Sequence, residues 1–161
     1  MPGLMRLLAA GRQLVSARYV RPDWFTSHIL NPLVAFLMRL GISVRGSQVL
    51  AVRGRITGQW RTTPVYLLTH RGERYLVSPR GVTQWARNVR ANGEAELRLG
   101  QRRERIHAIE LTDDEKPDIL RAYLRRWHFE VSELFGHVGP NAPDADFRRI
   151  APGHPVFRIL P

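Results

Sequence analysis

The chain has 161 residues, contains no cysteine and has a formal net charge of +11. That length suits one domain with a substantial core. The absence of cysteine excludes a disulfide framework, a thiol nucleophile and a cysteine-ligated metal. The absence of cysteine also fits a reducing compartment, so we expect a cytoplasmic protein.

The positive charge is concentrated in residues 1–72, which contain ten arginines and a single acidic residue, Asp23. Such a field attracts nucleic acid, an anionic membrane face or an anionic cofactor.

Helices are predicted before the first strand. Apolar residues recur at helical spacing over residues 4–18, and within residues 24–40 Asn31 can cap a helix that begins at Pro32 and stops at Gly41. Both segments are basic and amphipathic, so residues 1–40 are a candidate for peripheral membrane contact. Helices that cover a sheet share this pattern. No stretch has the roughly 20 apolar residues that a bilayer span needs, and the N-terminus does not resemble a signal peptide.

From residue 47 onward the apolar pattern changes to that of strands. Arg71 and Gly72 form a turn signal between two of them. Ending on a strand suggests that the C-terminus is paired into the sheet. Six short strands are predicted, at residues 49–52, 65–69, 75–77, 95–99, 105–111 and 156–160.

Three helices are predicted among these strands. Thr83 can cap a helix that runs to about residue 91 and ends at Asn92-Gly93, with Trp85 and Val89 pointing inward. A capping-box pattern at residues 112–115 precedes an amphipathic helix over residues 119–127. Because Pro117 is safe only in the first turn, Asp114 is the alternative cap. A short helix is predicted at residues 144–150.

This order of elements lacks the βαβ repeats of a doubly wound fold. It favours an α+β protein built mainly on antiparallel strands, a small barrel with flanking helices. We expect residues 1–46 to form an N-terminal helical segment packed on the barrel and residues 47–161 to form the barrel domain.

The loop after the first strand carries arginines and glycines within a few residues. Glycine lets backbone N–H groups approach a ligand, and arginine offers planar donors that suit phosphate or carboxylate. The composition therefore fits a polyanion site, and it equally fits a solvated hairpin turn. The residues concerned are Arg53, Gly54, Arg55, Thr57, Gly58, Arg61, Thr62 and Thr63.

The familiar signatures of catalysis are missing. The six histidines form no metal-binding pair, and neither a G-x-S-x-G nor a Walker motif occurs. An enzyme of this sequence would take its reactivity from a bound organic cofactor. No nucleic-acid reader motif is present, so we expect no nucleic-acid partner.

Three motifs in this order resemble the deazaflavin-dependent nitroreductase and quinone reductase family. They are V-R-G-R-I-T-G-Q-W-R-T-T-P-V at residues 52–65, Y-L-V-S-P-R-G at 75–81 and T-Q-W-A-R-N-V-R-A-N-G at 83–93. The resemblance implies a split β-barrel of the FMN-binding type and the cofactor coenzyme F420, with FMN a weaker alternative. Coenzyme F420 has a deazaflavin ring, a ribityl-phosphate and an acidic oligoglutamate tail.

The resemblance also assigns roles by position. The phosphate and tail would be held by Arg55, Thr57, Gly58 and Arg61. The backbone facing the ring and the ribityl chain would be that of Thr63, Pro64 and Val65. The ring edge and phosphate would be lined by Ser78, Pro79, Arg80 and Gly81. The site would be closed by Trp85, Arg87 and Asn88.

The chain departs from the family pattern at two places in the loop. Ile56 stands where family members often have lysine, and Trp60 stands where they often have proline; Arg53 is a candidate replacement for the lysine. The substrate-side tyrosines of nitroimidazole-activating members have no clear match, so nitro-drug reduction is not implied.

The implied activity is hydride transfer from reduced F420 to a small flat acceptor, quinone-like or nitro-aromatic. Tyr123 and His128 are candidate proton donors. The alternative function is a non-catalytic carrier of a deazaflavin, a flavin or another anionic ligand. The protein would be a monomer or a homodimer.

Overall fold

The computed structural model describes residues 37, 39–43 and 46–161. The helices predicted over residues 4–18 and 24–40, with the N-terminal segment and the membrane contact expected of them, lie outside the described residues except for a few positions near residue 40. Within the described part of the chain, every helix is too short or too polar to cross a lipid bilayer.

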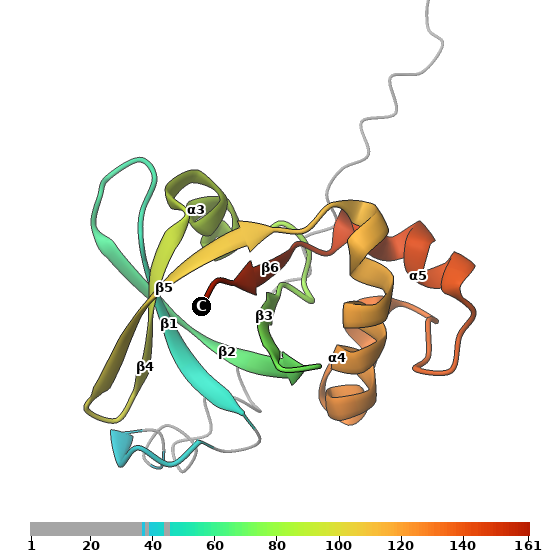
Figure 1. Cartoon of the computed structure of the whole chain (residues 1–161), viewed down its shortest axis with the longest axis horizontal. Helices are drawn as coiled ribbons and strands as arrows, with labels where there is room; N and C mark the ends of the chain where they lie inside the picture. The colour runs from blue at the N-terminus through green and yellow to red at the C-terminus, as the bar shows by residue number, and fades with distance from the viewer. Residues whose placement is uncertain (1–36, 38, 44–45) are drawn as a thin grey trace, which may run out of the picture.

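Six antiparallel strands close into a barrel, as the sequence predicts (Figure 1). Around the barrel the order is β1-β2-β3-β6-β5-β4, so the last strand of the chain lies between β3 and β5. The predicted pairing of the C-terminus is thereby confirmed. The strands are β1 (Ser47–Arg53), β2 (Trp60–His70), β3 (Glu73–Val77), β4 (Glu94–Leu99), β5 (Arg102–Glu110) and β6 (Val156–Ile159).

The protein has two hydrophobic cores, one on each face of the sheet, because side chains alternate between the two faces along the strands. Leu76 on β3 and Phe157 on β6 pack together in the barrel interior, whereas their neighbours Tyr75, Val77 and Val156 belong to a second core outside it. Successive residues of a strand point to opposite faces of the sheet, so β2, β3 and β6 contribute to both cores, whereas β1, β4 and β5 contribute to the barrel core alone.

Strand β2 begins at Trp60, five residues before the predicted start. Its first half pairs with β1 from Arg53↔Trp60 to Ser47↔Tyr66, and its second half pairs with β3. The polar Arg61, Thr62 and Thr63 gave no apolar signal for a strand. They are tolerated because this half of β2 is exposed or borders a cavity rather than the core.

Helix α3 (Gln84–Asn92) connects β3 to β4 and has the predicted ends. The Thr83 hydroxyl accepts a hydrogen bond from the N–H of Ala86, and Gly93 adopts φ 68° at the C-terminus, a left-handed conformation that glycine accepts without cost. Val89 is fully buried, and Trp85 packs against Phe157 with ring centroids 5.9 Å apart.

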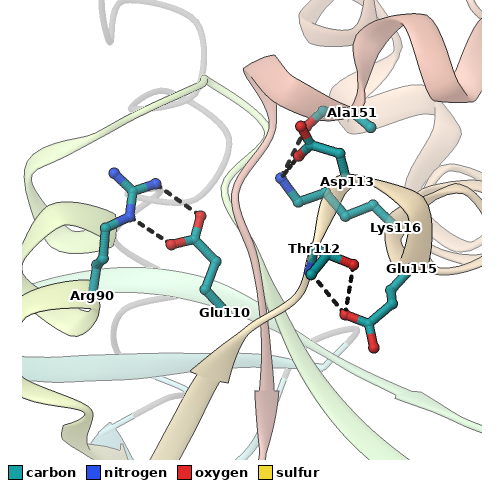
Figure 2. Close-up of polar contacts among 7 residues, drawn as sticks. All are labelled: Arg90, Glu110, Thr112, Asp113, Glu115, Lys116 and Ala151. Carbon is teal, nitrogen blue, oxygen red and sulfur yellow. Dashed lines mark hydrogen bonds and ion pairs between the residues drawn. The ribbon is translucent and has the colours of Figure 1, made fainter.

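Helix α4 (Lys116–Val131) follows a short 3₁₀ turn, η1 (Asp113–Glu115). The capping box joins Thr112 and Glu115: the Glu115 carboxylate accepts from the Thr112 N–H at 2.8 Å and from its hydroxyl at 3.0 Å (Figure 2). The alternative cap at Asp114 is wrong, because the 3₁₀ turn absorbs these residues and leaves Pro117 in the first turn of α4.

The second core lies between α4 and the barrel. Helix α4 stands beside β2 and β3, and α5 (Asp144–Ile150) lies on its far side (Figure 1). Trp127 stacks on Tyr66 of β2, with ring centroids 4.9 Å apart, and contacts Tyr123 one turn earlier on α4. Two further 3₁₀ turns, η2 (Ser132–Phe135) and η3 (Ala151–Gly153), flank α5 and lead the chain back to β6.

Candidate functional site

A cavity of about 620 Å³ opens where β2, the β1–β2 loop, the β3–α3 connection and α3 meet, and α4 contributes one side chain to it. All three sequence motifs therefore border one space. The lining residues are Gly54, Arg55, Ile56, Thr57, Arg61, Thr62, Thr63, Pro64, Val65, Val77, Ser78, Pro79, Arg80, Thr83, Gln84, Trp85, Asn88 and Tyr123.

The β1–β2 loop is closed by its own backbone. The N–H of Gly54 donates to the carbonyl of Gln59, and the N–H of Gly58 donates to the carbonyl of Gly54, both at 2.8 Å. Gly58 has φ 69°, a conformation that disfavours other residues. Arg53 supports the loop from outside the cavity, since its guanidinium donates to the Gly58 carbonyl at 3.0 Å and lies 4.6 Å from the Trp60 ring centroid.

Arg55 is tied to α3 at three points. The Asn88 side-chain oxygen accepts from the Arg55 backbone N–H at 3.1 Å and from Nη1 at 2.9 Å, and Nη1 also donates to the Gln84 side chain at 3.0 Å. Asn92 adds a further link, donating to the carbonyl of Arg53 at 2.8 Å. Helix α3 therefore fixes both the loop and the guanidinium of Arg55, which lines the cavity.

The connection from β3 to α3 is held by a chain of hydroxyl groups. Ser78 Oγ donates to the carbonyl of Gly81 at 2.6 Å, so Thr83 Oγ1, 3.0 Å away, is the donor to Ser78 Oγ. Thr83 Oγ1 in turn accepts from the N–H of Ala86 at 3.3 Å. Both hydroxyl protons are thus used in hydrogen bonds within the wall of the cavity.

Replacing Thr83 with valine is expected to lower the free energy of unfolding by about 1–3 kcal/mol, since it removes the cap of α3 and the buried donor to Ser78. Urea denaturation followed by circular dichroism measures the change. Thr69→Val on β2, where the side chain is exposed, is the matched control and should change stability by less than about 0.5 kcal/mol. Equal effects of the two changes would contradict the hydroxyl chain.

His154 lies behind this wall, between η3 and β6. Burial and, to a smaller extent, the nearby Lys116 lower the pKa of its ring to about 4, although the backbone of Ser78 and Pro79 acts in the opposite direction. The ring is therefore neutral in the folded protein at neutral pH.

This pKa makes stability depend on pH. Because the ring has an ordinary pKa of 6.5 when unfolded, the unfolded state binds more protons between pH 6.5 and 4. The stabilisation is complete above pH 6.5 and is lost as the pH falls toward 4, at most by about 3 kcal/mol. Urea denaturation at pH 7, 5.5 and 4.5 should show a smaller loss for His154→Phe than for the wild type; parallel losses would contradict this.

The electrostatics of the lining favour an anion. The lining contains three arginines, Arg55, Arg61 and Arg80, and no acidic residue. Helix α3 begins at the cavity, and the N-terminus of a helix favours negative charge through its backbone N–H groups and dipole. The lining also includes the apolar or aromatic residues Pro64, Val65, Val77, Trp85 and Tyr123.

The structure brings together most of the residues that the sequence marked as cofactor contacts. Those in the lining are Arg55, Thr57, Arg61, Thr63, Pro64, Val65, Ser78, Pro79, Arg80, Trp85 and Asn88. Those outside it are Arg53, Gly58, Gly81 and Arg87. Of the two candidate proton donors, Tyr123 lines the cavity, whereas His128 lies outside the lining with its ring against Phe129.

The lining also contains residues to which the family resemblance assigned no cofactor contact: Gly54, Ile56, Thr62, Val77, Thr83 and Gln84. Each lies within or beside one of the three motifs, so adjacency in sequence was the available signal. Ile56, at the position where lysine is usual, is 84% exposed at the edge of the cavity.

The cavity fits a cofactor that has both a flat ring and anionic groups. Its volume lies within the usual range for small-molecule sites. Guanidinium donors and the start of α3 suit phosphate and carboxylate groups, and the apolar side chains suit an aromatic ring. The residues present therefore match the chemistry of coenzyme F420.

Comparisons with known proteins agree with this chemistry. A family model described as F420H(2)-dependent quinone reductase matches residues 33–130. Among curated proteins, none matches the sequence.

Solved structures show the expected split-barrel fold. A structure described as a domain-swapped dimer is 17% identical, with a TM-score of 0.51, and the match covers 87% of this chain and all of that one. Atu2129 of Agrobacterium tumefaciens, of unknown function, is 15% identical with a TM-score of 0.50, over 88% of this chain and 57% of that one. An F420-H2 dependent reductase, FDR-A, is 18% identical with a TM-score of 0.48, over 72% of this chain and 95% of that one.

The family match covers well over half of the chain and includes all three motifs around the cavity. The chain belongs to the F420H(2)-dependent quinone reductase family, and its cofactor is coenzyme F420.

Proposed function

We propose that the protein transfers a hydride from reduced F420 to a small, flat, quinone-like acceptor. The observation that carries this proposal is the composition of the cavity that all three motifs border: its lining has three arginines and no acid, and it combines apolar and aromatic side chains with hydroxyl and amide groups. An anionic redox cofactor and a flat acceptor need these two environments side by side.

Arg55, Arg61 and Arg80 would hold the phosphate and carboxylate groups of the cofactor. Arg55 is prepared for this role, because Gln84 and Asn88 already fix its guanidinium at 3.0 and 2.9 Å. Preorganised donors lose less entropy on binding an anion. The backbone of Thr63, Pro64 and Val65 on β2 would face the ring and the ribityl chain.

The apolar part of the cavity would orient the acceptor and exclude water. When bound, reduced F420 supplies the hydride, so the contribution of the chain is to align the two rings and keep them dry. Trp85 and Tyr123 provide the aromatic surfaces in the lining.

Tyr123 would donate a hydrogen bond to an acceptor oxygen. Burial raises the pKa of its phenol far above the ordinary value, so the hydroxyl keeps its proton throughout the physiological range. A phenol held neutral in this way is a hydrogen-bond donor to a carbonyl oxygen that gains charge as the acceptor is reduced.

The test is a turnover assay with reduced F420 and a panel of quinones and nitro-aromatics. Turnover is monitored as the increase in the absorbance of oxidised F420. Quinones should be reduced, and Tyr123→Phe should lower kcat while leaving the Kd of F420 within about twofold. Cofactor binding without reduction of any acceptor would overturn the proposal in favour of a carrier. Size-exclusion chromatography with light scattering on the same sample distinguishes a monomer from a homodimer.

A further inference from the structure

Three amide side chains follow one another along a single face of α3, at Gln84, Asn88 and Asn92. Residues four apart in a helix lie above one another, so the three form a row, called here the amide row. The row faces the β1–β2 loop, because each member hydrogen-bonds to Arg53 or Arg55. Gln84 and Asn88 also line the cavity, whereas Asn92 contacts the loop from outside the lining.

The amide of Asn92 bridges the helix and the loop. Its Nδ2 donates to the carbonyl of Arg53 and to the carbonyl of Asn88, both at 2.8 Å. Since both partners are acceptors, only the nitrogen end of the amide can face them, and both of its protons are used. An ionised aspartate has no proton to donate and a serine has one. The position therefore suits a primary amide.

The contacts from α3 hold the loop on both sides of Gly54. Asn92 donates to the carbonyl of Arg53 on one side, and Asn88 accepts from the backbone N–H of Arg55 at 3.1 Å on the other. The peptide groups that flank Gly54 are thus both bonded to the same helix. The direction in which the chain leaves β1, and with it the place of the Arg55 side chain, depends on these two contacts.

Gly54 connects this base to the rest of the loop. Its N–H donates to the carbonyl of Gln59, and its carbonyl accepts from the N–H of Gly58, both at 2.8 Å. A Cβ at residue 54 would lie only 3.1 Å from Oγ1 of Thr57, so the loop is closely packed here. A shift of Gly54 would therefore also move Ile56 and Thr57, which line the cavity.

The helix that bears the amide row is anchored without the loop. On another face of α3, Arg90 forms a two-point ion pair with Glu110 of β5, at 2.5 and 2.8 Å (Figure 2). The carbonyl of Gly93, which follows the helix, accepts from the N–H of Ala108 on β5 at 2.9 Å. Helix α3 is therefore a fixed support, and the amide row transfers its position to the loop.

We propose that Asn92 is a positioning residue of the cofactor site, which holds the β1–β2 loop against α3 so that Arg55 meets the anionic groups of the cofactor. Its effect on the cofactor passes through the loop, since Asn92 does not line the cavity. The helix gives no reason for this residue, because asparagine is a poorer helix former than leucine. The inference deepens the proposed function and rests on it for the identity of the ligand.

Two variants separate the loop contact from the stability of the helix. Asn92→Leu removes both donors, keeps the net charge and raises helix propensity. The Arg90→Gln/Glu110→Gln double variant is the matched control. It removes the ion pair that anchors the same helix to β5, leaves the net charge unchanged and alters no printed contact of the loop.

Hydrogen exchange without cofactor is the first measurement. Asn92→Leu should speed exchange at least fivefold in the peptide that covers residues 53–60, where the N–H groups of Gly54, Arg55 and Gly58 are hydrogen-bonded. Peptides from β3 and β6 should stay within twofold of the wild type. The control variant should leave the 53–60 peptide within twofold. Unchanged exchange of this peptide in Asn92→Leu would overturn the proposal.

The second measurement tests whether Asn92 acts through Arg55. Asn92→Leu should raise the Kd of oxidised F420 about fivefold in the wild type and in Arg61→Ala, because Arg61 is held on β2 by pairing with Val52. In the Arg55→Ala background the increase should be twofold or less, since the side chain that the loop positions is missing.

An equal increase in the Arg55→Ala and Arg61→Ala backgrounds would show that Asn92 does not act through Arg55 and would overturn the proposal. The same holds if the control variant weakens F420 as much as Asn92→Leu does, because loosening of α3 would then explain both. Absence of F420 binding by the wild type would instead count against the proposed function, and the exchange result would still decide whether Asn92 positions the loop.

Discussion

Arg55→Ala and Arg61→Ala should each weaken the binding of F420 by about 1–3 kcal/mol, the usual worth of a charge-assisted hydrogen bond. Both side chains line the cavity, which contains no acidic residue to offset them. The double variant should lose roughly 100-fold or more in affinity, which is about 2.8 kcal/mol. Fluorescence titration of the oxidised cofactor gives the three dissociation constants.

The two arginines are expected to differ in how they act. Arg55→Ala also removes the guanidinium donor to the buried side-chain oxygen of Asn88 and leaves only the backbone N–H of residue 55 as its donor from the loop, so this variant should loosen the β1–β2 loop. Among the described residues, Arg61 makes no side-chain hydrogen bond or ion pair that could be lost, and its replacement should leave stability unchanged. Arg148→Ala on α5, an exposed arginine far from the lining, controls for net charge. Affinities of the arginine variants within twofold of the wild type would contradict the anion site.

Trp127→Ala should destabilise the protein by about 3–5 kcal/mol, the range for deleting a large buried aromatic side chain. Trp127 is fully buried, stacks on Tyr66 of β2 and contacts Tyr123. It therefore joins α4 to the barrel and supports the one cavity residue that α4 supplies. The loss is measured as the shift in the urea midpoint together with the slope of the transition.

The control for this change lies two residues along the same helix. Phe129 is 86% exposed, so Phe129→Ala should change the free energy of unfolding by less than about 0.5 kcal/mol. A cost for Trp127→Ala below 1 kcal/mol would show that the α4 core does not hold the helix against the barrel.

The barrel could be predicted from the sequence because its strands combine local signals. The turn at Arg71-Gly72 and the apolar runs of β1, β3 and β6 each carry their own pattern, and both residues of that turn adopt positive φ. The start of β2 could not be read, because Arg61, Thr62 and Thr63 extend the strand through pairing with β1 rather than through apolar character. The cap of α4 depended on a 3₁₀ turn that no local residue signals.

The site was predictable to the extent that it is contiguous in sequence. Arg55 and Asn88 fall in two motifs 33 residues apart, and the fold joins them directly. Tyr123 could be proposed only as a weak candidate, since its place in the lining depends on how α4 packs. Arg53 and Gly58 lie in the right loop, yet they shape it from outside the cavity.

Binding of F420 to the purified 161-residue chain is the measurement that tests the central claim most directly. Oxidised F420 should show a saturable fluorescence change at micromolar protein, it should bind more tightly than FMN, and the Arg55→Ala/Arg61→Ala variant should lose the change. No change in fluorescence with the folded wild-type protein, or tighter binding of FMN, would contradict the assignment of the cavity to the deazaflavin cofactor.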